Sequence, residues 1–416
     1  MAITLTDTPA EVREGETINV FSANNNLFFE FTAGAGETSL QVKLTDSVPA
    51  DLGVIKTLPF DSSGVLKVDT HYILKDSLNN ADYTNDTYNN VGDLYMVGSS
   101  IVQNFLIAYR VAGTGAYTSP SQVYLGVNSA RQIGGTFGAT MAEYWPILST
   151  GPTVDFTGKF LTRFEKPVLF WYSTSATPSA SNTSAFNIGL SFLMPTDGFT
   201  VFDAIEVGWR KNGAVVNDET YEPATTITSN AVHVPIPEAE SFCYQSDTLF
   251  IQVGELQTGP SFGNELTENL EIEVRRACEN PYALRWLNTL GGFDTWVFEG
   301  NASRELNVEN EGDYGIVNED LKTATATRGM TTKIAFPSVS LFADNLTLQQ
   351  AKGLEDLLIS PSVYLFVGDL STAGAAFDDW QSVTIEGGGF TSYDTFNTRH
   401  KLELTINLAG INTVKA

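Results

Sequence analysis

Strict alternation of apolar and polar residues near the end of the chain is the feature that most constrains its fold. Residues 401–408 read Lys-Leu-Glu-Leu-Thr-Ile-Asn-Leu, so every second residue is apolar. Because successive side chains of a strand point to opposite faces of a sheet, this pattern is typical of a strand with one buried and one wet face. Similar alternation occurs at 40–45 and 270–275, and the apolar runs at 101–111 and 248–253 are typical of buried strands.

The length of the chain favours more than one domain. At 416 residues it is longer than one ordinary domain. We expect a mainly β protein with two or three β-sandwich or β-barrel-like domains and few short helices. The predicted boundaries are 1–112 for an N-terminal β-sandwich domain, 113–277 for a middle β domain with long loops, and 278–416 for a C-terminal α+β domain. The last contains a junction helix, a capped helix over 347–359 and a terminal hairpin.

Two local motifs predict particular elements. Asn212-Gly213 lies between apolar segments, and this dipeptide is the strongest short signal for a hairpin. Thr347 and Gln350 have the spacing of a capping box, which begins a helix, and an apolar stripe follows at helical spacing. Pro361 marks the end of that helix, because proline cannot continue it.

The charge balance argues against one class of partner. Acidic residues outnumber basic residues by 49 to 23, which gives a formal net charge of −26 at pH 7 with histidine neutral. A nucleic-acid-binding face needs clustered lysine and arginine, so no specific nucleic-acid binding is expected. Charged residues make up only 17% of the chain, against roughly 25% for average soluble proteins. The hydrophobic content of 42% suffices for proper cores.

The cysteines and the N-terminus bear on the compartment. Cys243 and Cys278 are the two cysteines, and their spacing fits neither a CxxC motif nor a metal site. Each lies beside an apolar run, so we expect buried free thiols, with a bridge between the two cysteines as the alternative. Residues 1–7 lack the basic and apolar regions of a signal peptide. No apolar run approaches the ~20 residues that span a bilayer, so no membrane insertion is expected.

One polar loop, 79–93, is rich in asparagine and aspartate oxygens. Such a loop could hold Ca²⁺, which takes about six to eight oxygen ligands. It does not fit the DxDxDG pattern, however, and runs of these residues are ordinary turn chemistry. We therefore predict no cofactor and no metal, with cation binding at 79–93 as the alternative.

The sequence shows no catalytic constellation. His71, His233 and His400 lie far apart, and the chain contains no HExxH, GxSxG or phosphate-binding loop. We expect His400 to be an exposed or rim residue rather than a base. Neighbouring carboxylates such as Asp378 and Asp379 carry no signal in a chain with 49 acidic residues. We predict that the protein is not an enzyme and has no catalytic residue.

The stretch 278–298 joins two regions of strand pattern. Asn280-Pro281 starts a turn, because proline fixes its own φ and keeps the preceding residue out of the helical region. The spacing of Tyr282, Trp286 and Leu290 predicts two helical turns over 282–290.

Gly291-Gly292 would end that helix, because a residue with positive φ is least costly as glycine. Residues 293–298 then alternate at strand spacing. We interpret the whole stretch as a structural junction, with Trp286, Trp296 and Phe298 as core anchors. A ligand platform built on Trp286 and Trp296 is the alternative. The junction residues are Cys278, Asn280, Pro281, Trp286, Leu287, Asn288, Gly291, Gly292, Trp296 and Phe298.

The same stretch carries a resemblance. Its pattern, Cys-x-Asn-Pro-x-x-Leu-x-Trp-Leu-Asn-x-x-Gly-Gly-x-Asp-x-Trp-x-Phe, resembles one in tail-region structural proteins of phages and prophages of Bacteroidetes. The helix at 348–358 followed by Ser-Pro and an apolar strand is similar to a unit of the same proteins. A strand, an aspartate and a short helix within 60–78 also resemble theirs. Thr289 departs from the pattern, because those proteins often carry an arginine there.

The resemblance implies a non-enzymatic subunit of a virion, in a tail tip, baseplate or adaptor ring. Such a subunit is made in the host cytoplasm and assembles with copies of itself, in a ring or other symmetric oligomer, and with neighbouring virion tail proteins. The acidic composition is consistent with this role, because an acidic ring would repel DNA and let it pass without adhering.

Two competing functions follow from other features. A receptor- or carbohydrate-binding adhesin of β-sandwich type would place aromatic residues at loop tips, and Tyr83, Tyr88 and Trp380 are candidates. A polysaccharide-degrading enzyme would need two carboxylates roughly 5 to 10 Å apart across a cleft.

Overall fold

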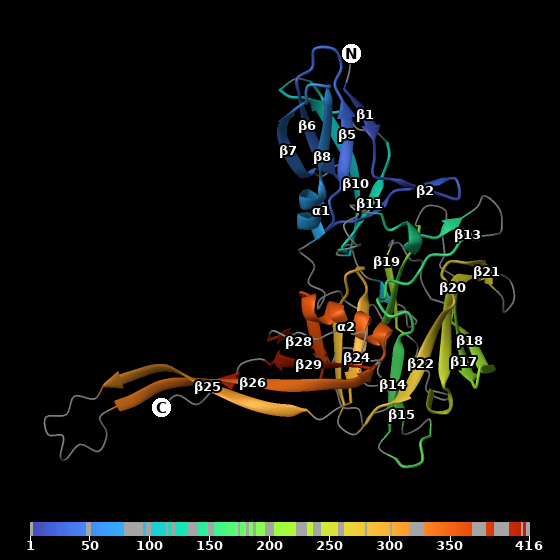
Figure 1. The fold of residues 1–416 in the computed structure, drawn as a ribbon, viewed down its shortest axis with the longest axis vertical. Helices are drawn as coiled ribbons and strands as arrows, with labels where there is room; N and C mark the ends of the chain where they lie inside the picture. The colour runs from blue at the N-terminus through green and yellow to red at the C-terminus, as the bar shows by residue number, and fades with distance from the viewer. Residues whose placement is uncertain are drawn as a thin grey trace. The chain divides into compact units, whose positions relative to one another are not determined.

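The computed structural model is mainly β, as the sequence predicts (Figure 1). Within the part of the chain that it describes there are two α-helices and short 3₁₀ turns. The described residues are 3–46, 51–78, 95–96, 101–113, 115–118, 121–130, 140–148, 154–173, 175–179, 183–185, 189–195, 204–221, 231–235, 243–256, 262–278, 281–299, 302–315, 328–367, 380–386, 399–408 and 411–412.

The chain divides into two compact units, each built from several segments. The first unit comprises Met1–Leu169, Asn187–Val274 and Asn288–Asp294. The second comprises Phe170–Phe186, Arg275–Leu287 and Thr295–Ala416. The division into consecutive domains at 112 and 277 stays a prediction.

The N-terminal part of the first unit contains two sheets, a hairpin and a helix. A three-stranded sheet has the order β1 (Thr4–Asp7), β5 (Phe28–Thr32), β8 (Val65–Asp69). A five-stranded sheet has the order β4 (Val20–Ser22), β11 (Tyr124–Val127), β10 (Val102–Val111), β6 (Ser39–Thr45), β7 (Asp51–Pro59). Strands β2 (Glu11–Arg13) and β3 (Glu16–Ile18) form the hairpin, and α1 spans His71–Leu78.

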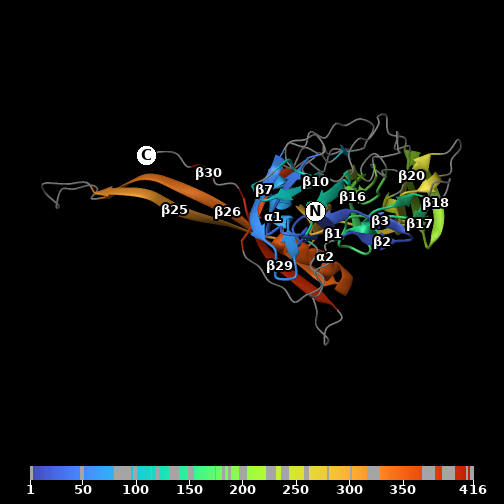
Figure 2. The same ribbon diagram turned by 90° about the horizontal axis from the view of Figure 1, so that it is seen from above.

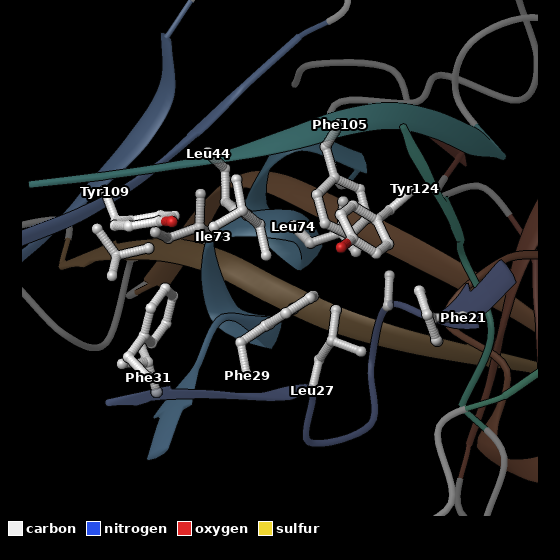
Figure 3. Close-up of a cluster of buried hydrophobic side chains, with 14 of the residues drawn as sticks. Phe21, Leu27, Phe29, Phe31, Leu44, Ile73, Leu74, Phe105, Tyr109 and Tyr124 are labelled. Atoms are coloured by element: carbon white, nitrogen blue, oxygen red, sulfur yellow. The ribbon is translucent and has the colours of Figure 1, made fainter. Parts of the chain in front are cut away.

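The core of this part combines aromatic and aliphatic side chains (Figure 3). Phe29 of β5 and Phe105 of β10 both pack on the ring of Tyr124, with ring centroids 5.4 and 5.5 Å away. Helix α1 packs closely because glycines face it: a Cβ on Gly126 would lie 2.5 Å from Leu74 Cδ2. The predicted strand, aspartate and short helix within 60–78 are confirmed as β8 and α1.

The rest of the first unit is built from further sheets. Strands β16 (Gly189–Leu193), β19 (Ala231–Pro235) and β9 (Tyr95–Met96) pair in that order, and β12 (Ile147–Leu148) pairs with β13 (Val154–Phe156). A seven-stranded sheet has the order β15 (Thr183–Ala185), β14 (Val168–Ser173), β22 (Leu270–Arg276), β20 (Thr248–Leu256), β17 (Ala204–Lys211), β18 (Ala214–Tyr221), with β21 (Phe262–Glu265) on β20. The 3₁₀ turns η1 and η3 span Ala142–Tyr144 and Cys243–Gln245. The boundary between the units falls within β14 and β22, and β15 belongs to the second unit.

The predicted hairpin at Asn212-Gly213 is confirmed. It joins β17 to β18, and Asn212 and Gly213 have φ of 51° and 77°. Positive φ at both central residues is the requirement of a type I′ turn, which explains why this dipeptide occurs there.

The described part of the second unit contains one helix and an eight-stranded sheet, of which only residues 293 and 294 of one strand belong to the first unit. The strand order is β24 (Phe293–Phe298), β23 (Tyr282–Leu287), β27 (Val363–Phe366), β28 (Trp380–Ile385), β29 (His400–Asn407), β26 (Arg328–Leu346), β25 (Ser303–Gly315), with β30 (Ile411–Asn412) on β26. Helix α2 spans Leu348–Ile359. Its predicted capping box is confirmed, because Thr347 Oγ1 accepts from the Gln350 N–H at 3.2 Å and Gln350 Oε1 accepts from the Thr347 N–H at 3.0 Å.

Three predictions about this part of the chain are wrong. The expected helix over 282–290 is strand β23 followed by a turn, because the backbone of 284–286 pairs with β27. His400 is buried rather than exposed, because it lies in phase with the apolar residues of β29. Cys278 is free but exposed rather than buried. Its neighbour Ala277 is buried, and successive side chains of an extended chain point in opposite directions.

The glycine of β17 that faces Phe250 gives a test of sheet packing. A Cβ on Gly208 would lie 1.7 Å from Phe250 Cζ. We expect Gly208→Ala to lower the free energy of unfolding by about 1–3 kcal/mol, the usual cost of overpacking, in urea denaturation. Adding Phe250→Leu should recover part of that loss. If the two changes destabilise additively, the ring does not fill the space above the glycine.

Candidate functional site

The turn between β23 and β24 is held by the amide of Asn288. This side chain is buried, and its Oδ1 accepts from the N–H groups of Leu290 and Gly292 at 2.9 and 3.0 Å. Its Nδ2 donates to the Leu161 carbonyl at 2.8 Å and to Asp294 Oδ2 at 2.9 Å. An asparagine amide offers two donors and two acceptor sites, so these four bonds use its full capacity.

Asp294 continues this network towards residues 161–164. Its Oδ1 accepts from the Thr162 hydroxyl at 2.5 Å, and its Oδ2 accepts from the Arg163 N–H at 3.1 Å. The Thr162 oxygen in turn accepts from the Phe164 N–H at 3.2 Å. The buried carboxylate is therefore surrounded by donors, which is the condition for burying a charge without a large penalty.

The two glycines of the turn are required by space and by backbone conformation. Gly291 has φ of +88°, and a Cβ there would lie 2.9 Å from the Asn128 carbonyl oxygen. A Cβ on Gly292 would lie 2.1 Å from the Leu161 carbonyl oxygen. Residues 288–294 thus lie against two other segments of the first unit, and the Ala130 N–H donates to the Thr289 carbonyl at 2.7 Å.

The aromatic residues predicted as anchors are buried on the strands beside this turn. Trp286 and Phe298 are 0% and 2% exposed, and Trp296 is 4% exposed with its ring 5.4 Å from that of Phe170. Leu287 is also buried and donates its N–H to the Ser362 carbonyl at 3.1 Å. Neither tryptophan ring is therefore available at the surface for stacking on a ligand.

Two other predicted junction residues lie at the start of the stretch. Pro281 is half-buried just before β23. Asn280 lies outside the described residues, as do Tyr83, Tyr88 and the candidate cation loop 79–93. The role of the ten predicted residues as a structural junction stays a prediction. Among the described residues, no group of three or more metal-ligating side chains comes together.

A buried arginine missed by the sequence reasoning lies next to the predicted anchors. Arg285 is 7% exposed, and its guanidinium lies 4.8 Å from the ring centroid of Trp380 and 5.6 Å from that of Tyr364. Trp380 also packs edge-on to Phe366, with ring centroids 5.3 Å apart. Trp380 therefore lies within the sheet of the second unit, over a cation, rather than at a loop tip.

A half-buried carboxylate in the first unit has a perturbed pKa. Burial raises the pKa of Glu268 above its usual value, and the positive charge of Lys159 opposes that rise. Lys159 also forms an ion pair with Glu143 at 3.0 Å. The fold therefore favours the protonated form of Glu268.

An exposed edge strand distinguishes the second unit. Strand β25 lies at the end of the sheet order and, among the described strands, pairs only with β26. Both views show the ribbon of β25 and β26 running out beyond β29 of the same unit (Figures 1 and 2). Every residue from 302 to 309 is exposed, so this stretch of β25 is open to solvent on both faces. Leu306 and Val308 lie on one face and are 58% and 50% exposed.

Comparisons with known proteins give no relative for this chain. No protein-family model and no curated protein sequence matches it. Among solved structures, the human OSCAR ligand-binding domain aligns with a TM-score of 0.17 and 9% identity, covering 65% of this chain and 96% of that one. A mutant Salmonella alpha-2-macroglobulin aligns with a TM-score of 0.20 and 6% identity, covering 100% of this chain and 21% of that one.

The native conformation of E. coli alpha-2-macroglobulin aligns with a TM-score of 0.18 and 8% identity. The chain spans 22% of the length of that protein. TM-scores this low carry no argument about function. None of the helices in the described residues has the length and apolar character needed to cross a membrane.

The Asn288 network gives a direct test of the turn. Asn288→Ala would leave the buried N–H groups of Leu290 and Gly292 without their acceptor. At about 1–3 kcal/mol for each orphaned group, we expect the free energy of unfolding to fall by roughly 2–5 kcal/mol in chemical denaturation. Asn288→Asp should also destabilise, because it places a carboxylate against Asp294. Adding Asp294→Asn should recover part of that loss. A double variant no more stable than Asn288→Asp would contradict this account.

The raised pKa of Glu268 predicts that Glu268→Gln raises the melting temperature by an amount that depends on pH. An acid with a raised pKa in the folded state contributes stability below its unfolded pKa, and that contribution is lost as the pH rises through the folded pKa. We therefore expect Glu268→Gln to raise the melting temperature relative to wild type near pH 7 and to lose this advantage near pH 4. Glu265→Gln at an exposed position is the control. An equal gain at both pH values would exclude titration of Glu268 as the cause.

Proposed function

We propose that the protein is an architectural subunit of a phage tail, in the tail tip, the baseplate or an adaptor ring. It acts by assembling with copies of itself and with neighbouring virion tail proteins rather than by catalysis. The observation that carries this proposal is the open strand β25, exposed at every residue from 302 to 309. A strand that is exposed on both faces and open along one edge is a template for a further strand, so it favours a function in which another chain covers it.

Two sequence features support the same proposal. The pattern over 278–298 resembles that of tail-region proteins from phages and prophages of Bacteroidetes, and its asparagine, glycines and aspartate are the residues that build the turn at 288–294. The net charge of −26 suits a ring through which DNA passes, since lining and cargo repel each other. The virion is the corresponding location.

The mass of the purified protein in solution tests the proposal. We expect light scattering at two protein concentrations and two salt concentrations to give a discrete oligomer of three or more copies. Association should strengthen at high salt, because salt screens the repulsion between acidic subunits. A monomer under all four conditions, together with binding to a glycan array, would instead support the adhesin alternative.

A further inference from the structure

We propose that β25 pairs with β25 of a second copy of this chain, antiparallel and centred on Leu306. This inference rests on the proposed architectural function and names the surface and the partner. The paired segment is Ser303–Glu309. The contact is two-fold and joins two copies through one continuous sheet, so an oligomer of more than two copies would be built from such pairs through a further surface.

The backbone of β25 is suited to such pairing. Its ladder with β26 is regular from Ser303, opposite Ser340, to Asn310, opposite Lys333, and becomes irregular only beyond Asn310. The outer edge of a regular strand presents unpaired N–H and C=O groups, which are a template for another strand.

Two longer edge strands of the large sheets, β24 and β18, differ from this one, and β15 at the fourth edge has only three residues. All six residues of β24 are buried. Strand β18 carries a bulge at Val216, because Val215 pairs with Arg210 and Asn217 pairs with Trp209. Bulges are one of the devices by which proteins protect an edge from pairing. Of the three longer edge strands, β25 is the regular and exposed one.

The apolar side chains of β25 set the centre of the contact. Leu306 and Val308 are two residues apart and so lie on one face of the strand. In an antiparallel pair centred on Leu306, this residue lies opposite Leu306 of the second copy. The two leucines and the two valines then form one apolar strip that a single copy leaves in water.

The two faces of β25 select the orientation, and its charged residues select the register. A parallel pair through the same edge would place the Leu306 side chains of the two copies on opposite faces of the joint sheet. An antiparallel pair centred on Glu305 would place that residue against its own copy, and like charges in opposite positions destabilise a sheet. An antiparallel pair centred on Asn307 would place Glu305 against Glu309. The pair centred on Leu306 avoids direct like-charge contacts, because Arg304 then faces Val308, Glu305 faces Asn307 and Glu309 faces Ser303.

A shift of the register by one residue is excluded by the pleat of the strand. Antiparallel copies that meet at the same edge of β25 present the same face, and directly opposite side chains share a face, so an even-numbered residue cannot lie opposite an odd-numbered one. The nearest allowed registers are centred on Glu305 and on Asn307, and both bring like charges together. The register centred on Leu306 is therefore favoured.

Cysteine cross-linking measures the register directly. In a background with Cys243→Ser and Cys278→Ser, we expect Leu306→Cys to form a disulfide-linked dimer under mild oxidation, because directly opposite Cβ atoms are about 4.5–5.5 Å apart. Asn307→Cys on the same strand is the matched control. It should cross-link at least about tenfold more slowly, since it lies diagonal to its own copy at roughly 7–8 Å. Equal cross-linking of both variants, or none by Leu306→Cys, overturns the proposal.

Charge variants test the same contact without cysteine. Leu306→Lys should weaken association by at least about tenfold in sedimentation equilibrium, because two lysines would lie opposite each other. Val216→Lys, at a comparably exposed valine of β18, should leave association unchanged. Glu309→Lys should strengthen it, most at low salt, because the new lysine lies diagonal to Glu305 of the second copy.

The failure of this inference is distinguishable from the failure of the proposed function. An oligomer whose mass and affinity are indifferent to Leu306→Lys and Glu309→Lys assembles through another surface, which overturns the inference and leaves the architectural function standing. A strict monomer at every concentration and salt level argues against both. Unchanged melting temperatures confirm that each variant folds.

Discussion

The hydrogen bonds of the buried Asn288 amide stabilise the turn at residues 288–294, on which the rest of this part of the structure depends. Residues 288–294 belong to the first unit, whereas the chain on either side of them belongs to the second. The turn between β23 and β24 buries several backbone N–H and C=O groups that no neighbouring strand pairs. Each would cost free energy if it were left without a hydrogen bond. The Asn288 amide satisfies two backbone N–H groups and one carbonyl, and it orients Asp294, which satisfies a further backbone N–H.

Sheet edges are the second constraint on this molecule, because a protein with so many strands must cover or interrupt each edge. Strand β24 is covered and β18 is bulged. Strand β25 has neither protection over 303–309, although Glu305 and Glu309 place negative charge on one of its faces. Charge on an edge is itself a protective device, and here the negative charge lies on the face opposite Leu306 and Val308, whereas Arg304 shares their face.

Much of the fold could be predicted from the sequence where the local pattern and the tertiary environment agree. The alternation at 401–408, the Asn212-Gly213 turn and the Thr347 capping box each act within a few residues, and each was confirmed. The prediction of a helix over 282–290 is wrong, because a strand buried on both faces shows no alternation of apolar and polar residues. Its aromatic spacing then fits a helix equally well.

One other error had a signal in the sequence that could have corrected it, whereas two features of the structure had none. His400 lies in phase with Leu402, Leu404 and Ile406, so the alternation itself places it on the buried face. The burial of Arg285 had no such signal, because the two rings that cover it come from β27 and β28, far along the chain. Gly291 and Gly292 predict the end of an element, but the hydrogen-bond network of the turn at 288–294 depends on Leu161 and Thr162, which no local pattern connects to it.

In the proposed pairing, apolar burial on one face of β25 is opposed by repulsion between carboxylates on the other. The apolar face gains from association because Leu306 and Val308 leave water, and this gain does not depend on the screening of charge. The opposite face brings Glu305 and Glu309 of the two copies diagonally near one another, and this repulsion is screened by salt. Association should therefore be weak for dilute, newly made chains and strong where subunits are held close together. A strand with both faces apolar would lack this restraint and would be prone to uncontrolled edge-to-edge aggregation.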